Sequence, residues 1–418
     1  MDPRTHEIDH GAGYIGYQEA LDSVCSNMRL LGSEEIPLDS SLRRTVAEAA
    51  AAVVDCPLAD ISLKDGFAVI SANVAMASGN NPAALEVIGS AYAGTDFQGR
   101  LKSGQAVRVC SGASIPPGAD AVMPSEFCEE ISGRELRVYA DADAARNILP
   151  FGEEVKKGAG VIQKGDLLSS GLMGLAAAGG ISRIRVYRRP RVAIVAIGDE
   201  IVSPGAALAP GQVYASNLVT LKAWLQSFGI DCMTSLVRDN ADAIRTELAK
   251  RRPVADVILT SGGAWGSERD LIVGILAELG WREVFHHVRM GPGKGISFGL
   301  WEYLPVFCLP GGPASNEMAF LQLALPGILR MEGIERHPLP SVPAMLLEDI
   351  SGRNINWTEF KGAILSKHPD DGYVVRAFKG RSRLQSIART NSLLCIPEGR
   401  DSLRRGERVS IQILTPLP

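Results

Sequence analysis

The hydrophobic positions that follow Arg189-Pro190 fall into short, almost unbroken runs separated by amphipathic segments. Unbroken apolar runs of this length are typical of parallel strands that are covered on both faces. Segments 217–226 and 241–251 instead repeat apolar residues at helical spacing. Strands that alternate with helices of about 10–15 residues predict a doubly wound, mostly parallel α/β domain. The clearest strand runs are RVAIVAIG, CMTSLV, ADVILTSG, EVFHHVR and PVFCLPG.

The rest of the chain has a different pattern. From about Asp65 to Val155, short apolar runs are divided by glycine, proline and asparagine, which predicts a β-rich module. After about Arg336 the chain is β-like again, and we expect a small β-barrel there. Before the β-rich module, the run LRRTVAEAAAAVV predicts a helix that ends before Pro57. The fold class is therefore multidomain α/β plus β.

Composition narrows the class of protein. The chain has 418 residues, enough for two to four domains, and its 46% hydrophobic and 22% charged residues are typical of a globular protein. The net charge of -4 and the absence of a basic cluster exclude a nucleic-acid partner. No apolar stretch is long enough to span a membrane. Seven scattered cysteines, never spaced as C-x-x-C, are typical of a reduced cytoplasm, so we expect a cytoplasmic protein without membrane partners.

Polar, glycine-rich segments follow four of the predicted strands. If the sheet is parallel, these four exits lie along one edge, which is where ligands bind in such sheets. Glycines there allow backbone N–H groups to approach a phosphate closely, and Mg²⁺ held by the acids would offset their repulsion of the phosphate. The four exits contain Asp199-Glu200, Arg238-Asp239, Gly262-Gly263 through Asp270, and Gly311-Gly312-Pro313 with Ser315.

Each feature also has an ordinary structural interpretation. A Gly-Gly pair after a strand is more often a turn, and Asp239 and Asp270 have the positions of helix N-caps. Trp265 can either cap a core or stack on a planar ligand, and Lys294 is either an exposed loop lysine or a phosphate contact. The coincidence of four such exits favours the ligand site.

Eight motifs in a fixed order carry a resemblance to a known family. The chain resembles the molybdopterin molybdenumtransferase family, which includes bacterial MoeA and the E domain of gephyrin, from about Gly16 to Leu417. The resemblance implies an α/β pterin-nucleotide domain similar to the small molybdopterin adenylyltransferase fold. It also implies three further domains. We expect a discontinuous linker domain over 14–58 and 154–189, a β-rich domain over 59–153, the α/β domain over 190–335 and a β-barrel over 336–418. The motifs are DGFAV, SGASIPPGADAV, GEEVKKG, AIGDEIV…PGQVYASN, VRDN, TSGG…ERD, MGPGKGISFG and LPGGPASN.

The resemblance also implies the chemistry. Family members insert molybdate into adenylylated molybdopterin, release AMP and use Mg²⁺. They are homodimers whose active cleft lies between the α/β domain of one subunit and the β-rich domain of the other. Carried onto this chain, the catalytic acids are Asp65, Glu154, Glu200, Asp239 and Asp270, of which Glu200, Asp239 and Asp270 are expected to bind the metal. The residues expected to bind the pterin nucleotide are Ser111, Gly112, Ser261, Gly262, Gly263, Lys294, Pro310, Gly311, Pro313 and Ser315.

The chain departs from the family pattern mainly at basic and hydroxyl positions. Gly291 stands where lysine or arginine is common, Gly312 replaces an asparagine, and Ile197 replaces a threonine. Fewer cations weaken the binding of a polyanion, so these changes indicate a divergent paralogue whose oxyanion is molybdate or tungstate. Two alternatives remain open: a non-catalytic pterin-nucleotide-binding or scaffold protein, and a Mg²⁺-dependent hydrolase of another nucleotide pyrophosphate. The retained acids favour an enzyme.

Overall fold

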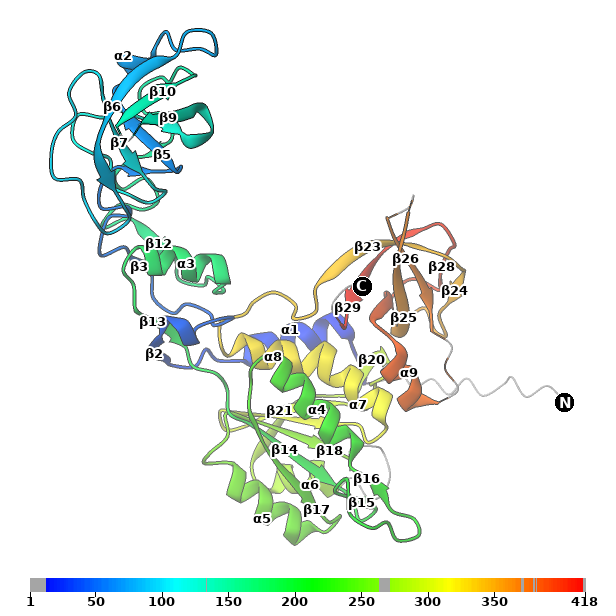
Figure 1. Cartoon of the computed structure of the whole chain (residues 1–418). Coiled ribbons are helices and arrows are strands. Elements are labelled where there is room, and N and C mark those ends of the chain that lie inside the picture. The colour runs from blue at the N-terminus through cyan, green and yellow to red at the C-terminus, as the bar shows by residue number, and fades with distance from the viewer. Residues whose placement is uncertain are drawn as a thin grey trace. The chain divides into compact units, whose positions relative to one another are not determined.

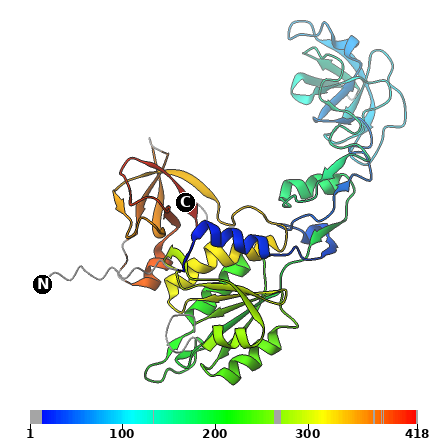
Figure 2. The same ribbon diagram turned by 180° about the vertical axis from the view of Figure 1, so that it is seen from behind.

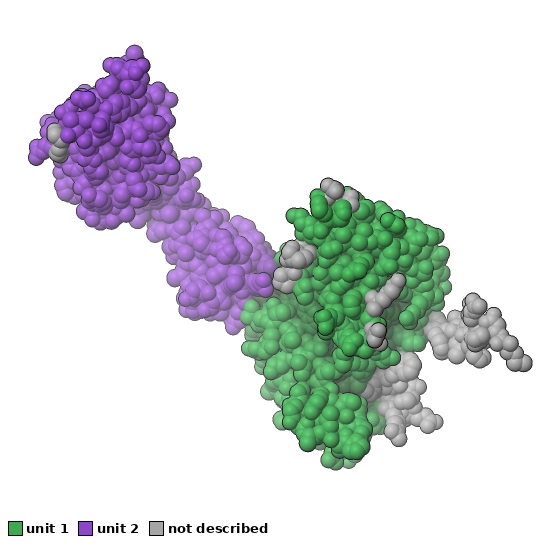
Figure 3. All heavy atoms as spheres, turned by 45° about the vertical axis from the view of Figure 1, so that its right-hand side comes forward, with its two compact units in different colours: residues 1–32, 187–418 green, residues 33–186 purple. Residues whose placement is uncertain are grey.

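The computed structural model describes residues 13–132, 134–262, 271–369, 372–378, 380 and 382–415. The chain divides into two compact units, residues 1–32 with 187–418 and residues 33–186 (Figure 3). Among the helices of the described residues, none has the length and hydropathy that a membrane span requires. This division into two units does not test the boundaries of the four expected domains, which stay a prediction.

Six strands form the α/β sheet of the first unit. They are β14 (Val192–Ile197), β17 (Cys232–Val237), β18 (Val257–Ser261), β19 (Trp281–His286), β21 (Ser297–Trp301) and β22 (Leu304–Leu309). The order is β17-β14-β18-β22-β21-β19. Four of these strands, β14, β17, β18 and β21, are labelled in Figure 1. The first four strands run parallel, whereas β21 pairs antiparallel with both β22 and β19. The mostly parallel sheet is therefore confirmed.

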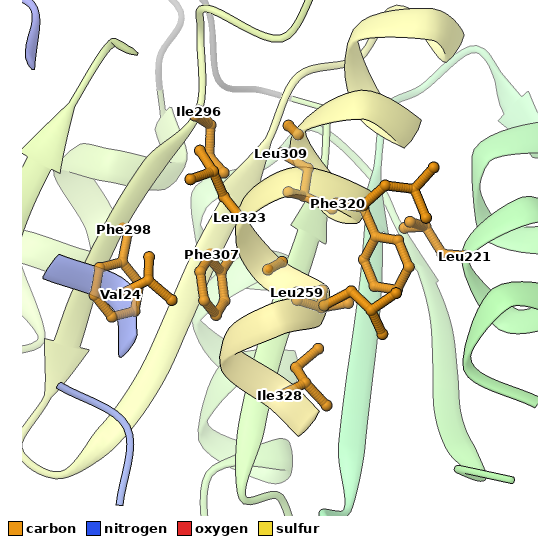
Figure 4. Close-up of a cluster of buried hydrophobic side chains, with 14 of the residues drawn as sticks. Val24, Leu221, Leu259, Ile296, Phe298, Phe307, Leu309, Phe320, Leu323 and Ile328 are labelled. Atoms are coloured by element: carbon orange, nitrogen blue, oxygen red, sulfur yellow. The ribbon is translucent and has the colours of Figure 1, made fainter. Parts of the chain in front are cut away.

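Helices cover one face of this sheet with a large apolar core. Their side chains meet Leu259, Phe307 and Leu309 of the strands (Figure 4). The N-terminal helix, blue in Figure 2, packs beside the yellow helix that contains Gly327, where a Cβ would lie 2.6 Å from Val24 Cγ1. The absence of a side chain at Gly327 thus lets the two helices approach closely. The segments on this face are α1 (Tyr17–Asn27), α4 (Ser216–Ser227), α7 (Pro313–Ala319), the π-helical η3 (Phe320–Ala324) and α8 (Leu325–Arg330).

The opposite face is covered by α5 (Ala241–Arg251) and α6 (Leu271–Glu278). Ile244 and Ile275 of these helices share a core with Val195 of β14, whereas the neighbouring Ile194 belongs to the other core. Successive side chains of a strand point to opposite faces, so a strand that is buried on both sides needs an unbroken apolar run. This arrangement confirms the doubly wound α/β domain.

The predicted strand EVFHHVR is divided in two by the structure. β19 ends at His286, and His287 has a left-handed φ of 67°. The chain then enters β20 (Val288–Gly291), which leaves the α/β sheet and pairs with β1 (Ile15–Gly16) and with β25 (Thr358–His368). The prediction of one continuous strand was wrong, because alternating apolar residues do not reveal a change of sheet.

A closed ring of five strands follows, which confirms the expected C-terminal barrel. β25 pairs with β26 (Gly372–Ala377), which pairs with β23 (Ser341–Leu346). From β23 the ring continues through β29 (Arg408–Ile413) and β27 (Ser392–Ile396) back to β25. Buried Leu, Ile and Val side chains fill its interior. The short elements beside it are α9 (Arg383–Arg389), β24 (Ile350–Ser351) and β28 (Ser402–Leu403).

The second unit contains a six-stranded sheet of order β8-β5-β7-β6-β10-β9, as expected for a β-rich module. Its strands are β5 (Gly66–Val69), β6 (Ala83–Ala91), β7 (Gln105–Val109), β8 (Ala121–Pro124), β9 (Cys128–Ser132) and β10 (Glu135–Val138). The described residues of this unit also contain three small strand pairs: β2 (Ser33–Pro37) with β13 (Arg183–Tyr187), β3 (Ala50–Ala51) with β12 (Gly160–Ile162), and β4 (Ile61–Ser62) with β11 (Ile148–Leu149). Its helical segments are α2 (Ser71–Val74), α3 (Ser170–Ala178) and the short 3-10 helices η1 (Leu38–Ser40) and η2 (Ser125–Phe127).

The helix predicted for LRRTVAEAAAAVV does not form. Backbone N–H groups of this run bond to distant carbonyls instead of to residues four positions earlier. Val46 N donates to Asp166 O at 2.9 Å, and Ala52 N donates to Ala159 O at 2.9 Å. Helix propensity is a weak preference, and here the pairing with distant segments outweighs it.

Asp256 ties the starts of β14 and β18 together at the end of the sheet opposite the strand exits. Arg188 donates to both of its carboxylate oxygens, at 2.7 and 2.9 Å, and Arg191 donates to it from side chain and backbone. Burial raises the pKa of this carboxyl, but the hydrogen bonds from the two arginines outweigh burial and hold the pKa well below its usual range.

We expect Asp256→Asn to lower the free energy of unfolding of the first unit by about 2 kcal/mol at pH 7, because charge-assisted bonds are lost. A carboxyl with a lowered folded pKa stabilises the fold above its unfolded pKa, so the difference from wild type should shrink below about pH 4. All five tryptophans lie in this unit, so tryptophan fluorescence in urea reports on it. The exposed Asp231→Asn is the control, and an equal loss there would contradict the assignment.

Candidate functional site

The four predicted strand exits lie side by side. In the parallel registers, Ile197 is opposite Val237, Ala196 is opposite Ser261, and Ser261 is opposite Leu309. The carboxyl ends of β17, β14, β18 and β22 therefore meet at one edge of the sheet, as the sequence predicted.

Gly262 is the residue that brings two of these exits into contact. Its φ is +95°, and a Cβ at this position would lie 2.5 Å from the carbonyl oxygen of Ile197. Its N–H donates to Leu309 O at 3.3 Å, and a Cβ at Gly311 would lie 3.6 Å from the Gly262 Cα. Only glycine fits this position, as a close-approach loop requires. The rest of the predicted loop, including Gly263, Trp265 and Asp270, lies outside the described residues.

A cavity of about 150 Å³ opens at this edge. Its lining comes from three strand exits and from the start of α4, so residues far apart in the sequence share one wall. Five of the residues predicted as site residues line it: Glu200, Ser261, Gly262, Gly311 and Pro313. The sequence did not single out three further polar residues of the lining: Tyr214, Ser216 and Asn217. All three belong to the run VYASN that follows Gln212. This cluster of polar residues was the sequence signal that could have identified them.

The predicted acids at this edge differ in their surroundings. The carboxylate of Glu200 folds over Gly198, where a Cβ would lie 2.5 Å from Glu200 Oε2. Asp239 Oδ1 is buried and has no hydrogen-bond partner among the described residues. Within the described ranges, no group of three His, Cys, Asp or Glu side chains converges as a metal site. Asp270, the third predicted ligand, is not among the described residues.

A second cavity, of about 540 Å³, is bordered by two other predicted residues, Lys294 and Ser315. The barrel domain supplies most of its remaining polar lining, which the sequence did not predict. Glu359 is buried there, pairs with Lys361 Nζ at 3.2 Å and accepts backbone N–H groups of the adjoining loop. The residues supplied by the barrel are Arg353, Asn354, Trp357, Glu359, Phe360 and Lys361. In the run SGRNINWTEFK, a lysine and an arginine lie close to a tryptophan. That pattern was the sequence signal that could have identified these residues as part of a binding site.

A row of stacked rings adjoins the second cavity. His287 stacks on His286 at 3.9 Å and on Tyr14 at 4.7 Å, and Tyr14 lies 5.9 Å from the ring of Trp357. Burial, followed by the charges of His286 and Lys294, lowers the pKa of His287 to about 4. This imidazole is therefore neutral at pH 7, and the positive charge of the cavity comes from lysine and arginine.

Three of the four predicted site residues of the second unit lie together. Asp65 accepts the backbone N–H of Ser111 at 2.8 Å, and Gly112 N donates to Ser62 O at 2.8 Å. Asp65, Ser111 and Gly112 thus lie together at the DISLKDG loop. Glu154 is exposed on another loop, and its backbone N–H donates to Cys56 O at 3.0 Å. The carboxylate of Asp65 thus closes a loop, and its predicted catalytic role stays a prediction.

Comparisons with known proteins cover nearly all of the chain. The models of the MoeA N-terminal region (domain I and II), the probable molybdopterin binding domain and the MoeA C-terminal region (domain IV) match residues 15–180, 193–330 and 353–414. A crystal structure of the molybdopterin biosynthesis MoeA protein from Pyrococcus horikoshii is 31% identical, with a TM-score of 0.76, over 96% of this chain and 99% of that one. The chain belongs to the MoeA family. A second structure of the Pyrococcus MoeA protein has a TM-score of 0.79 at 26% identity, over 96% of this chain and 100% of that one.

Curated relatives extend the comparison. Proteins named molybdopterin molybdenumtransferase from Haemophilus influenzae and Bacillus subtilis are each 28% identical, over 91% and 96% of this chain and 93% and 94% of theirs. Membership of the MoeA family confirms the predicted resemblance and the multidomain fold class. The roles of individual residues in this MoeA-family chain stay predictions.

Gly262→Ala tests the close approach at the site. The new Cβ must displace the Ile197 carbonyl, so we expect a loss of unfolding free energy about 1–3 kcal/mol larger than that of a strain-only control. Gly280→Ala is that control, since Gly280 has a φ of +87° and a Cβ added there would meet nothing within 4 Å. Urea unfolding followed by tryptophan fluorescence measures both. Equal losses would mean that position 262 tolerates a side chain.

Proposed function

We propose that this MoeA-family chain is a molybdopterin molybdenumtransferase, which inserts molybdate into adenylylated molybdopterin and releases AMP in molybdenum cofactor biosynthesis. The observation that carries the proposal is the placement of two different cavities on either side of the first turn of α7. Pro313 lines the smaller cavity and Ser315 the larger one. A substrate that contains a phosphoanhydride and a second substrate that is an oxyanion need adjoining sites of this kind.

The smaller cavity suits a phosphorylated group. Gly262 and Gly311 leave their backbone exposed to a ligand, and the hydroxyls of Ser216 and Ser261 add neutral hydrogen-bonding groups. A phosphate bound here lies beside the acids of the β14 and β17 exits, which repel it. The cavity therefore requires a cation to hold the phosphorylated part of adenylylated molybdopterin.

The larger cavity suits the oxyanion substrate, molybdate or tungstate. Lys294, Arg353 and Lys361 surround it, with Glu359 compensating part of their charge. These cations favour a doubly charged oxyanion through charge-assisted hydrogen bonds. Arg353 and Lys361 come from the barrel. Their positive charge replaces that of the lysine or arginine that is common at the position of Gly291.

Mg²⁺ fits the acids at the strand exits. The buried Asp239 Oδ1 has no partner among the described residues, and an orphaned carboxylate oxygen is a typical ligand of a hard cation. We propose that Asp239 and Glu200 hold the ion, together with Asp270. When bound, Mg²⁺ neutralises charge on phosphate oxygens. The side chains of Asp239, Glu200 and Asp270 would position the ion.

The remaining expectations belong to the same proposal. Asp65, Glu154, Ser111 and Gly112 of the second unit are expected to contribute to the reaction through a homodimer, as the family resemblance implies. We also expect a cytoplasmic location, because the seven cysteines are scattered and never spaced as C-x-x-C.

An assay of AMP release tests the function. Adenylylated molybdopterin is incubated with the protein with and without molybdate and Mg²⁺, and AMP is measured by chromatography. We expect release that requires both. Binding without turnover would support a pterin-nucleotide-binding protein, and turnover without molybdate dependence would support a hydrolase of nucleotide pyrophosphates.

Asp239→Asn tests the metal assignment. Removing one charged ligand should weaken Mg²⁺ binding about 10- to 100-fold and lower AMP release in parallel. Calorimetric titration with Mg²⁺ measures the first effect independently of turnover. Asp242→Asn is the matched control, because its side chain is 94% exposed on α5. Unchanged Mg²⁺ affinity in Asp239→Asn would remove this residue from the proposed site.

A further inference from the structure

Two asparagine side chains converge on the hydroxyl of Ser261. Asn316 Nδ2 donates to Ser261 Oγ at 3.0 Å and to Pro310 O at 2.8 Å. Asn217 Nδ2 donates to the same Oγ at 3.3 Å and to Gly311 O at 2.8 Å. The three side chains come from α7, α4 and the end of β18, so the contact joins three elements at the strand edge.

The orientation of both amides is fixed by the backbone. The carbonyls of Pro310 and Gly311 can only accept, so each of them requires an N–H group at 2.8 Å. If either amide were rotated by 180°, its oxygen would face a carbonyl oxygen at that distance. Each amide therefore directs its second proton at Ser261 Oγ.

This arrangement determines what Ser261 can do. A hydroxyl has two acceptor lone pairs and one proton, and the two amides occupy both lone pairs. No hydrogen bond between described residues takes up the proton of Ser261. Ser261 is only 4% exposed, and its exposed part lines the smaller cavity. Within the described residues, the proton is therefore left for a ligand in that cavity.

We propose that Asn217 and Asn316 are positioning residues that hold Ser261 as an obligatory hydrogen-bond donor to an acceptor oxygen of the bound ligand. This inference rests on the proposed function and specifies it: the cavity selects a phosphate or another acceptor oxygen at this point. A ligand group that can only donate is rejected, because the hydroxyl has no lone pair left to accept from it.

A double-mutant cycle tests the proposal. Dissociation constants are measured by equilibrium dialysis without molybdate, with adenylylated molybdopterin and separately with inorganic pyrophosphate. Ser261→Ala removes the donor and should weaken binding about tenfold. Asn316→Asp replaces a donor with an acceptor that captures the serine proton, and it should weaken binding to a similar degree.

The cycle distinguishes positioning from a general structural effect. Combined with Ser261→Ala, the Asn316→Asp change should lose the part of its effect that acts through the hydroxyl and keep only the part caused by the added carboxylate, so the two single effects should not multiply fully. Ser261→Thr keeps a hydroxyl and should bind within about threefold of wild type. Asn217→Asp gives a second, more exposed version of the same change, should Asn316→Asp not fold. Asn80→Asp, at an exposed position of the second unit, controls for the change in net charge alone.

The outcomes distinguish the positioning role of the asparagines from the proposed substrate. Wild-type affinity in Ser261→Ala, or full multiplication of the single effects in the double variant, would overturn the positioning role. Binding of pyrophosphate but not of adenylylated molybdopterin, with the cycle intact, would support the hydroxyl assignment and contradict the proposed substrate. Failure of wild type to bind either probe would overturn both.

Discussion

The parallel pairing of β14 with β17 and β18 is the constraint on which the rest of the first unit depends. Parallel strands run in one direction, so their carboxyl ends emerge at one edge, spaced about 4.8 Å apart. Helices on both faces bury β14 completely and prevent any shift of register, because a slip of one residue exchanges the two cores. Residues as distant in the chain as Glu200 and Gly311 consequently line one cavity.

Charge is distributed unevenly around this framework. At the end of the sheet where β14 and β18 begin, Asp256 is neutralised by two arginines and has a structural role. At the exit end, Glu200 and Asp239 are not paired with a cation within the described residues. The cations cluster instead around the larger cavity. An anionic ligand between these two groups would be attracted from one side and repelled from the other, and a divalent ion held by the acids, as proposed, would reverse the sign of the repulsive side.

The sequence predicts the α/β domain well because each strand is a complete apolar run and each exit has glycines or acids. The edge formed by Glu200, Ser261, Gly262 and Gly311 follows from that pattern. Helix propensity fails to predict the structure where hydrogen bonds to residues distant in the sequence determine it. Ala52 N, for example, donates to Ala159 O, and the predicted helix does not form. The barrel residues Arg353 and Trp357 could not be placed at the larger cavity, since no periodicity reveals that β20 leaves one sheet and joins another.

Asn217 and Asn316 reduce the repulsion that the carboxyl ends of parallel strands exert on an anion. The carboxyl ends of strands present carbonyl oxygens, and an anion cannot approach them without repulsion. Asn217 and Asn316 cover the carbonyls of Gly311 and Pro310, which removes acceptors from the edge. With its remaining N–H, each amide also makes Ser261 a donor. The same four hydrogen bonds therefore stabilise the loop after β22 and convert an edge of acceptors into one that offers a proton to an anion.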